Sequence, residues 1–347
     1  MPEPRRVHPA GVVGYLLGSL ALALPLLFGG RRLLRSGPTL LRRSAGLASL
    51  LAAAVVLGFA GRVGWIFAEG PPAPLVEAWA PGVTHARVVT DRPGEGPVVL
   101  HAVEVDLPVA RPAFSLWPTP LTAGGTDFED RVGRLRVTTG AEALAATGAD
   151  LVLNASHFGP IYGDLVFWSY PRRGDPVLPM GSLAHGGDAF GVPQPHWPWV
   201  RLGPSVAIDA GSPGSAADAA DASAAVAFAG RSVLVSGGRP TPRGGHLAGD
   251  RYPRCALGLD AAGETLFLVV VDGKHPRRSV GLTLAALADR LVEMGVHDAV
   301  ELDGGGSAQL TRRLPGGTPV VVNRPSHQKI PGTQRPVGNH LAVRFAG

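Results

Sequence analysis

The sequence contains very little cysteine, lysine or aromatic side chain. Its 347 residues include one cysteine, Cys255, and two lysines, and aromatic residues make up 6% of the chain. A single cysteine excludes an internal disulfide and a cysteine-based metal site. No cysteine-hydrolase signature surrounds Cys255, so it is expected to be a buried structural thiol. Histidines at metal-ligand spacing and EF-hand loops are missing too. The sequence therefore predicts no metal site and no cofactor, and a structural Ca²⁺ bound by acidic loops is the alternative left open.

Acidic residues are almost absent from the first 68 residues. This segment holds eight arginines and one acid, Glu3, which gives it a charge of +7. The whole chain carries +5, so residues 69–347 carry −2. A basic chain suggests a nucleic-acid partner at first sight. Because the positive charge is confined to the N-terminal segment, the sequence predicts no nucleic-acid binding.

Two long uncharged runs lie in this basic segment, at residues 10–30 and 44–61. About 20 apolar residues span the hydrocarbon core of a bilayer as a helix. Five arginines lie between the runs, at 31–43, and short basic loops stay on the cytoplasmic side. Residues 1–68 are therefore predicted to be a membrane hairpin in the cell (inner) membrane, with everything after it on the extracytoplasmic side. A cleaved signal peptide is the alternative, although Arg31 and Arg32 stand where a small-residue cleavage site would be.

The rest of the chain is expected to be a Pro-rich linker, 69–82, and a catalytic domain, 83–347. Thr139, with Glu142 in a capping box, begins one predicted helix that ends at Gly148. Thr283 begins a second, which ends at Gly295. Short strand-like runs recur at 86–90, 98–107, 232–236, 256–259, 265–271, 319–322 and 341–345. The predicted fold class is α+β (mixed α/β), a twisted mixed β-sheet domain with flanking helices, preceded by two transmembrane helices.

Residues 209–229 are of low complexity and rich in alanine, aspartate and serine. Their first part is predicted to be a flexible surface insertion, and a helix is considered for the alanine-rich second part.

Both predicted helices are followed by an apolar strand that ends in a polar residue. The first strand ends at Asn154 and the second at Asp303. Ligands in open α/β sheets gather at such strand ends. If the two strands are neighbours, Asn154 and Asp303 face one site.

Three consecutive glycines, Gly304, Gly305 and Gly306, come directly after Asp303. Glycine costs more chain entropy on folding than other residues, so such a run is useful where the backbone must approach a ligand or adopt positive φ. Successive N–H groups in such a turn can bind an anion. Taken alone, however, this segment is more often a plain flexible turn.

Several short motifs occur in a fixed order. They are Arg254-Cys255, Asp272-Gly273-Lys274, Gly281-Leu282-Thr283, the 302–307 segment LDGGGS and Arg335-Pro336-Val337-Gly338-Asn339, with LNASHF at 153–158 upstream. Together they resemble the phosphodiester glycosidase family, over about residues 140–345. Cys255, Lys274, Ala155, Ser156 and His157 differ from the residues usual in that family. The resemblance implies a hydrolase that cleaves the glycosidic bond of a sugar-1-phosphodiester.

The resemblance and the chemistry of the residues together suggest a role for each. Arg254 and Arg335 suit a phosphate clamp, and Asp303 or Asp272 suits the nucleophile or base of glycoside cleavage. His157 suits proton transfer. The turn glycines, Asn154, Ser307, Lys274 and Asn339 complete the expected substrate-binding set. A purely structural role is the alternative for most of these residues. The arginines could form surface ion pairs, Asp272 could cap a turn, and Asn154 could form an Asx turn. His157 could be a polar loop residue, Ser307 a helix cap and Asn339 a strand end.

The sequence thus predicts a membrane-anchored glycosidase that remodels envelope or exopolysaccharide glycans, with a glycosyl phosphodiester as its substrate. The alternative is a non-catalytic phosphoglycan-binding protein that assists polysaccharide export. A transferase would use the same site, and the sugar, the aglycone, the anomeric outcome and the oligomeric state stay open.

Overall fold

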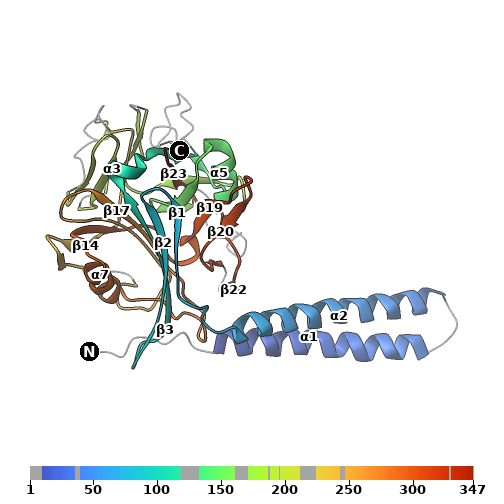
Figure 1. The fold of residues 1–347 in the computed structure, drawn as a ribbon. Coiled ribbons are helices and arrows are strands. Elements are labelled where there is room, and N and C mark those ends of the chain that lie inside the picture. The colour runs from blue at the N-terminus through green and yellow to red at the C-terminus, as the bar shows by residue number, and fades with distance from the viewer. Residues whose placement is uncertain are drawn as a thin grey trace.

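A helical hairpin protrudes from a body made of β-sheets (Figure 1). The computed structural model describes residues 10–35, 40–118, 133–160, 171–186, 188–194, 196–211, 224–242, 247–327 and 330–346. The hairpin consists of α1 (Ala10–Arg35) and α2 (Leu40–Ala68). Within these helices, Leu16–Leu34 and Arg43–Ala68 are long and apolar enough to cross a membrane. The two predicted apolar helices are therefore present as candidate membrane spans.

Small residues let α1 and α2 approach closely. A Cβ atom added to Gly30 would lie 2.9 Å from the carbonyl oxygen of Gly46, and one added to Gly46 would lie 2.9 Å from that of Gly30. Glycines at such crossings are typical of helices that pack in membranes. The Gly30–Gly46 contact therefore suits a membrane hairpin.

The largest sheet has eight strands, and each neighbouring pair is antiparallel. Their order is β1 (Leu75–Ala80), β2 (Val83–Arg92), β3 (Gly96–Asp106), β17 (Thr265–Val271), β16 (Arg254–Leu259), β18 (Asp298–Glu301), β14 (Val233–Ser236) and β15 (Arg239–Pro240). Helix α7 (Leu284–Glu293) packs on one face, where Leu287 and Leu291 join a cluster with Val269. The other face of the sheet contributes to the main core.

Two five-stranded sheets supply the rest of that core. One runs β20 (Pro319–Val321), β19 (Leu310–Arg313), β6 (Leu151–Asn154), β23 (His340–Arg344) and β4 (Ala113–Trp117), and helix α5 (Gly140–Thr147) packs against it. The other runs β10 (Asp188–Phe190), β9 (Leu183–His185), β13 (Val226–Ala229), β11 (Trp199–Leu202) and β12 (Val206–Asp209). Smaller pieces are α3 (Leu107–Ala110), β5 (Leu135–Arg136), β7 (Phe158–Pro160), β8 (Pro176–Pro179), β21 (Ser326–His327), β22 (Ile330–Pro331) and the 3₁₀ turn η1 (Gly305–Ser307). Leu257, Leu153 and Phe228, one from each large sheet, meet in the core.

The predicted helix caps are confirmed. Thr139 accepts a hydrogen bond from the N–H of Glu142 and Glu142 bonds back to Thr139, which completes the capping box before α5. Thr283 accepts from the N–H of Ala286 at the start of α7. The α+β class is confirmed as well, with the strands distributed over several antiparallel sheets.

Two segments differ from expectation. The segment 69–82, expected to be a linker, contains β1, whose backbone pairs with β2 from Leu75 to Ala80. In the low-complexity segment, the alanine-rich end considered as a helix is strand β13, and residues 212–223 lie outside the described residues. Val226 and Phe228 point into the main core while Ala227 and Ala229 face another cluster. Burial on both faces thus outweighs the helix propensity of alanine.

Candidate active site

Two of the candidate catalytic residues, Asp303 and His157, lie together. Asp303 follows β18, and His157 precedes β7. Nε2 of His157 is 3.5 Å from a carboxylate oxygen of Asp303, and the two side chains are 13% and 17% exposed. The His157 ring also meets the ring of Trp197 edge-on, with centroids 5.5 Å apart. A carboxylate paired with an imidazole and still open to solvent is an arrangement that can act on a bound substrate.

Asn154 holds the loop that carries Asp303. Its side-chain amide donates to the carbonyl oxygen of Asp303, and its side-chain oxygen accepts from the N–H of Gln309, at 2.9 Å. The side chain is buried, and both of its polar ends are engaged by backbone. The strands before Asn154 and Asp303 are not neighbours, which was the condition considered for a shared site, because β6 and β18 belong to different sheets. Their ends meet because the two sheets face each other across the core, where the N–H of Asp303 donates to Ala155.

The glycine turn is tightly enclosed by protein groups. Gly305 has φ +63°, and a Cβ atom added there would lie 2.6 Å from the Tyr252 ring. A Cβ atom on Gly306 would lie 3.4 Å from Nε of Arg335. The N–H group of Gly305 donates to the carbonyl oxygen of Pro253, and that of Ser307 donates to the carbonyl oxygen of Gly304. Within the part of the chain that the structure describes, the N–H groups of Gly304 and Gly306 donate to no protein atom. These two groups are the donors that the turn can offer a ligand.

Three basic side chains gather beside the turn: Arg335, Lys274 and His327. Arg335 donates to the hydroxyl of Ser307 at 3.4 Å, and its buried Nε has no partner among the described residues. The ammonium of Lys274 lies over the Tyr252 ring, 4.0 Å from its centroid. Burial, followed by the charges of Arg335 and Lys274, lowers the pKa of His327 to about 4. His327 is therefore neutral at pH 7, in surroundings that favour an anion.

Arg254, expected to contact phosphate, is turned to protein groups instead. It is 3% exposed. Its guanidinium donates to the carbonyl oxygens of Leu282, Leu247 and Asp250 and pairs with Glu301 at 3.2 Å. Burial lowers its pKa, and the Glu301 carboxylate acts in the opposite direction. These contacts tie the 247–250 segment and Leu282 to strands β16 and β18, so of the two expected clamp arginines only Arg335 directs its guanidinium to the glycine turn.

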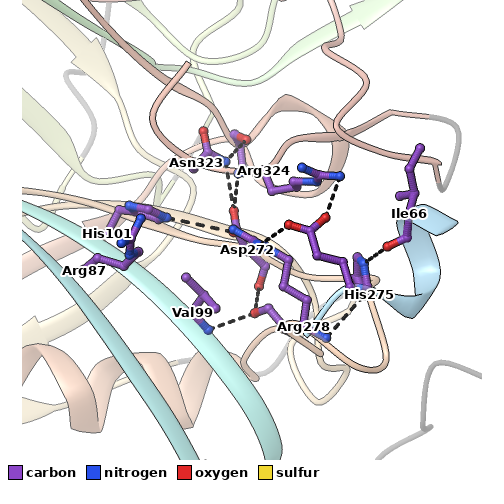
Figure 2. Close-up of polar contacts among 12 residues, drawn as sticks. Ile66, Arg87, Val99, His101, Asp272, His275, Arg278, Asn323 and Arg324 are labelled. Atoms are coloured by element: carbon purple, nitrogen blue, oxygen red, sulfur yellow. Dashed lines mark hydrogen bonds and ion pairs between the residues drawn. The ribbon is translucent and has the colours of Figure 1, made fainter. Parts of the chain in front are cut away.

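Asp272 lies behind the turn, buried in a polar network (Figure 2). One carboxylate oxygen accepts from the N–H of Arg324 at 2.7 Å and from the side chain of Asn323 at 3.3 Å. The other lies 3.7 Å from Arg278. Burial raises the pKa of this carboxyl, and the hydrogen bond from Arg324 opposes that effect. Asn323 continues to the turn, since its amide also donates to the carbonyl of Ala308. Asp272 therefore reaches the turn through Asn323.

Asn339 and Cys255 pack around the segment that carries His157. The side-chain oxygen of Asn339 accepts from the N–H of Ser156 at 2.8 Å, and its carbonyl accepts from Ala155. Cys255 is fully buried beneath this segment, and its thiol donates to the carbonyl of Asn154. Burial and the nearby Asp303 raise the pKa of this thiol well above its usual range. The expected structural thiol is confirmed.

The sequence did not point to Tyr252 or His327. Tyr252 comes two residues before the Arg254-Cys255 motif, and this position is its one local signal. Nothing in the sequence around His327 distinguishes it from the other histidines. Among the described residues, no group of three His, Cys, Asp or Glu side chains is placed to hold a metal ion.

Comparison with known proteins places these residues in a family context. Residues 199–344 match the sequence model of the phosphodiester glycosidases, which confirms the resemblance. The catalytic domain of zebrafish N-acetylglucosamine-1-phosphodiester α-N-acetylglucosaminidase, auto-inhibited by pro-peptide, has a similar fold: TM-score 0.51 at 17% identity, over 81% of this chain and 92% of that one. A hypothetical protein from Synechocystis gives a TM-score of 0.48 at 17% identity over 80% of this chain, which spans 64% of that protein's length. A search of curated proteins found no significant match.

Proposed function

We propose that this protein hydrolyses the glycosidic bond of a sugar-1-phosphodiester, because residues 199–344 match the sequence model of the phosphodiester glycosidases. The observation that carries the proposal is that Asp303, which pairs with His157, directly precedes the glycine turn and its basic neighbours. Such a substrate has two parts, an anionic phosphate and a sugar ring. The site offers a different set of groups to each.

The phosphate is assigned to the basic side of the turn. Arg335 supplies a guanidinium whose Nε is buried without a protein partner among the described residues. Lys274 adds a second positive charge, and the N–H groups of Gly304 and Gly306 add neutral donors. Charge-assisted hydrogen bonds from arginine are among the strongest contacts to phosphate. An anion here would also favour protonation of His327, because it would offset the positive charges that lower its pKa.

The sugar is assigned to Asp303 and His157. Cleavage of a glycoside passes through an oxocarbenium-like state, which a carboxylate stabilises or attacks. Asp303 takes this role at the anomeric carbon, and His157 orients the carboxylate and exchanges a proton with water or the leaving phosphate. The bond between C1 and the phosphate oxygen breaks, and water supplies the new oxygen on C1. The products are a free sugar and a phosphate monoester.

Asn154, Asn339, Arg254 and Asp272 are assigned positioning roles. The first two hold the loops of Asp303 and His157 from inside the core. Arg254 and Asp272 fix the strands and the loop behind the turn. Hydrogen bonds made by buried polar side chains rigidify a site. Their removal is therefore expected to displace the Asp303 loop.

The apolar helices α1 and α2 are proposed to anchor the protein in the cell membrane. The five arginines between the two apolar runs favour a cytoplasmic connection. That orientation puts the β-sheet body on the extracytoplasmic side, where envelope and exopolysaccharide glycans are available as substrates. A fusion of a reporter enzyme to each end of the hairpin would test this topology.

Release of free sugar tests the proposed activity. The full chain in detergent micelles is incubated with a panel of glycosyl-1-phosphodiesters, including UDP-N-acetylglucosamine, and free sugar is measured. The Asp303→Asn variant should lose the activity, whereas Asp209→Asn, which removes a carboxylate from an ion pair with Arg201, should keep it. Equal rates for Asp303→Asn and the unaltered chain would contradict the assignment.

The phosphoglycan-binding alternative is favoured by one observation: Cys255, Lys274 and the 155–157 segment depart from the residues usual in the family. It predicts tight binding of the panel compounds with no release of sugar by the unaltered chain. Release of a glycoside instead of free sugar when an acceptor alcohol is added would indicate a transferase.

A further inference from the structure

The end of α2 lies against the β-sheet body at the network behind the glycine turn. Nε2 of His275 is 2.6 Å from the carbonyl oxygen of Ile66, in the last turn of α2. Directly after the helix, Glu69 pairs with both Arg278 and Arg324, each at 2.8 Å. Glu69 and Arg324 are about one-third exposed, and Arg278 is less exposed. We call this three-residue contact of Glu69, Arg278 and Arg324 the Glu69 clasp.

The segments that hold the helix end also carry the basic groups of the site. Lys274 directly precedes His275, and His327 comes three residues after Arg324. Strand β21, which contains His327, packs on the glycine turn, and its partner β22 contacts α2. Figure 1 shows β22 on the side of the body where the hairpin leaves it. Consecutive Cα atoms are about 3.8 Å apart, so three residues span at most roughly 11 Å. The proposed phosphate site therefore lies close to the end of the apolar helix.

The position of Trp65 relates this site to the bilayer surface. Trp65, in the last turn of α2, is 79% exposed, and exposed tryptophans at the ends of spanning helices lie at the membrane interface. Glu69 follows four residues later, which is about 6 Å along a helix axis. The headgroup layer of one leaflet is roughly 5–8 Å thick. The clasp therefore falls at the level where lipid phosphates lie.

We propose that the substrate is a sugar-1-phosphate esterified to a membrane lipid, and that the Glu69 clasp holds the site at the height of that lipid's phosphate. The inference rests on the proposed function and names the aglycone of the same reaction. Water replaces the phosphate oxygen at C1, the free sugar leaves to the aqueous side, and the lipid phosphate monoester stays in the bilayer. Without the clasp, residues 69–74 would be a loose tether, and the distance between site and bilayer would vary.

Two probes with one sugar test the inference. Both carry the sugar released fastest in the panel above, one as a soluble methyl phosphodiester and one as a polyprenyl phosphodiester in phosphatidylcholine vesicles. The full chain is reconstituted in the same vesicles. One variant inserts eight Gly and Ser residues between Ala68 and Glu69, which leaves every side chain of the site unchanged. A second is Glu69→Gln, and the control is Asp209→Asn, which breaks an ion pair away from the hairpin.

The insertion is expected to lower the rate on the lipid probe by about tenfold or more, because a flexible tether reduces the effective concentration of site and substrate. Glu69→Gln should also lower the rate on the lipid probe, and the control variant should not. Rates on the soluble probe should stay unchanged in all three.

Equal rates of the insertion variant and the unaltered chain on the lipid probe would overturn the inference and leave the proposed function standing. So would an equal loss on both probes, which would mean that the hairpin acts on the fold of the site. Release from neither probe by the unaltered chain would contradict the proposed function itself.

Discussion

Replacement of Asn154 by leucine tests whether this buried amide holds the Asp303 loop. The two side chains are similar in size, but leucine cannot donate to the carbonyl of Asp303 or accept from the N–H of Gln309. Both backbone groups would then be buried without their partner. Each such loss costs about 1–3 kcal/mol, so Asn154→Leu should lower the free energy of unfolding by roughly 2–6 kcal/mol. Typical domains have about 5–15 kcal/mol available, so a folded population is expected to persist.

The assay has two readouts. Urea unfolding followed by circular dichroism gives the change in free energy of unfolding, and sugar release under folding conditions gives the rate. Because the loop carries Asp303, the rate of the folded fraction should fall by more than tenfold, about what 1.4 kcal/mol of lost transition-state stabilisation produces. Gln194→Leu is the matched control, because its side-chain amide donates at 3.5 Å to the carbonyl of Val192 and makes no other hydrogen bond among the described residues. An Asn154→Leu variant as stable and as active as this control would refute the reasoning.

Three further changes have defined outcomes. Arg335→Met should raise KM for a glycosyl phosphodiester by about tenfold to a hundredfold, because the loss of a charge-assisted hydrogen bond costs roughly 1.5–3 kcal/mol. An unchanged KM would mean that phosphate binds elsewhere. Gly305→Ala should destabilise the protein by about 1–2 kcal/mol because of the positive φ at this position alone. The Tyr252 ring, 2.6 Å from the added Cβ atom, should increase the loss, and thermal unfolding would measure it. Wild-type stability would contradict the close contact. Burial lowers the pKa of His340 to about 4 from 6.5, so the unfolded chain binds a proton between these values that the folded chain does not. The free energy of unfolding should therefore fall, by on the order of 3 kcal/mol, as pH decreases from 6.5 to 4. His340→Gln should remove that part of the slope, and a slope identical to that of the unaltered chain would be the contrary result.

Features that depend on residues close together in the sequence could be predicted. The capping box at Thr139 and the cap at Thr283 form because each side chain reaches backbone within its own first turn. The apolar helices follow from composition alone. By contrast, β1 and β13 form because a partner strand and a core are available to them, and their own residues carry only a weak signal.

Of the candidate site, the placement of Asp303 beside the glycine turn could be predicted from the sequence, and the placement of the arginines and Asn154 could not. Asp303 and the glycines are contiguous, so their proximity is a matter of chain geometry. Arg254 and Arg335 are the same residue type, and the motifs around them predicted the same role for both. The Arg254 side chain is nevertheless buried among carbonyl oxygens, whereas the Arg335 side chain lies at the turn. That difference depends on how distant loops pack. The partnership of Asn154 with Asp303 depends on two sheets facing each other, which strand patterns do not encode.

If Asp303 acts on the anomeric carbon, it is needed for release of sugar but not for binding of the phosphodiester. The full chain and its Asp303→Asn variant are compared for free-sugar production and for affinity toward the same glycosyl-1-phosphodiester. The variant should bind the compound while its rate of release falls by about 10³-fold or more, as expected when the group acting on the anomeric centre is lost. Undiminished release by Asp303→Asn, with the fold intact, would contradict this role.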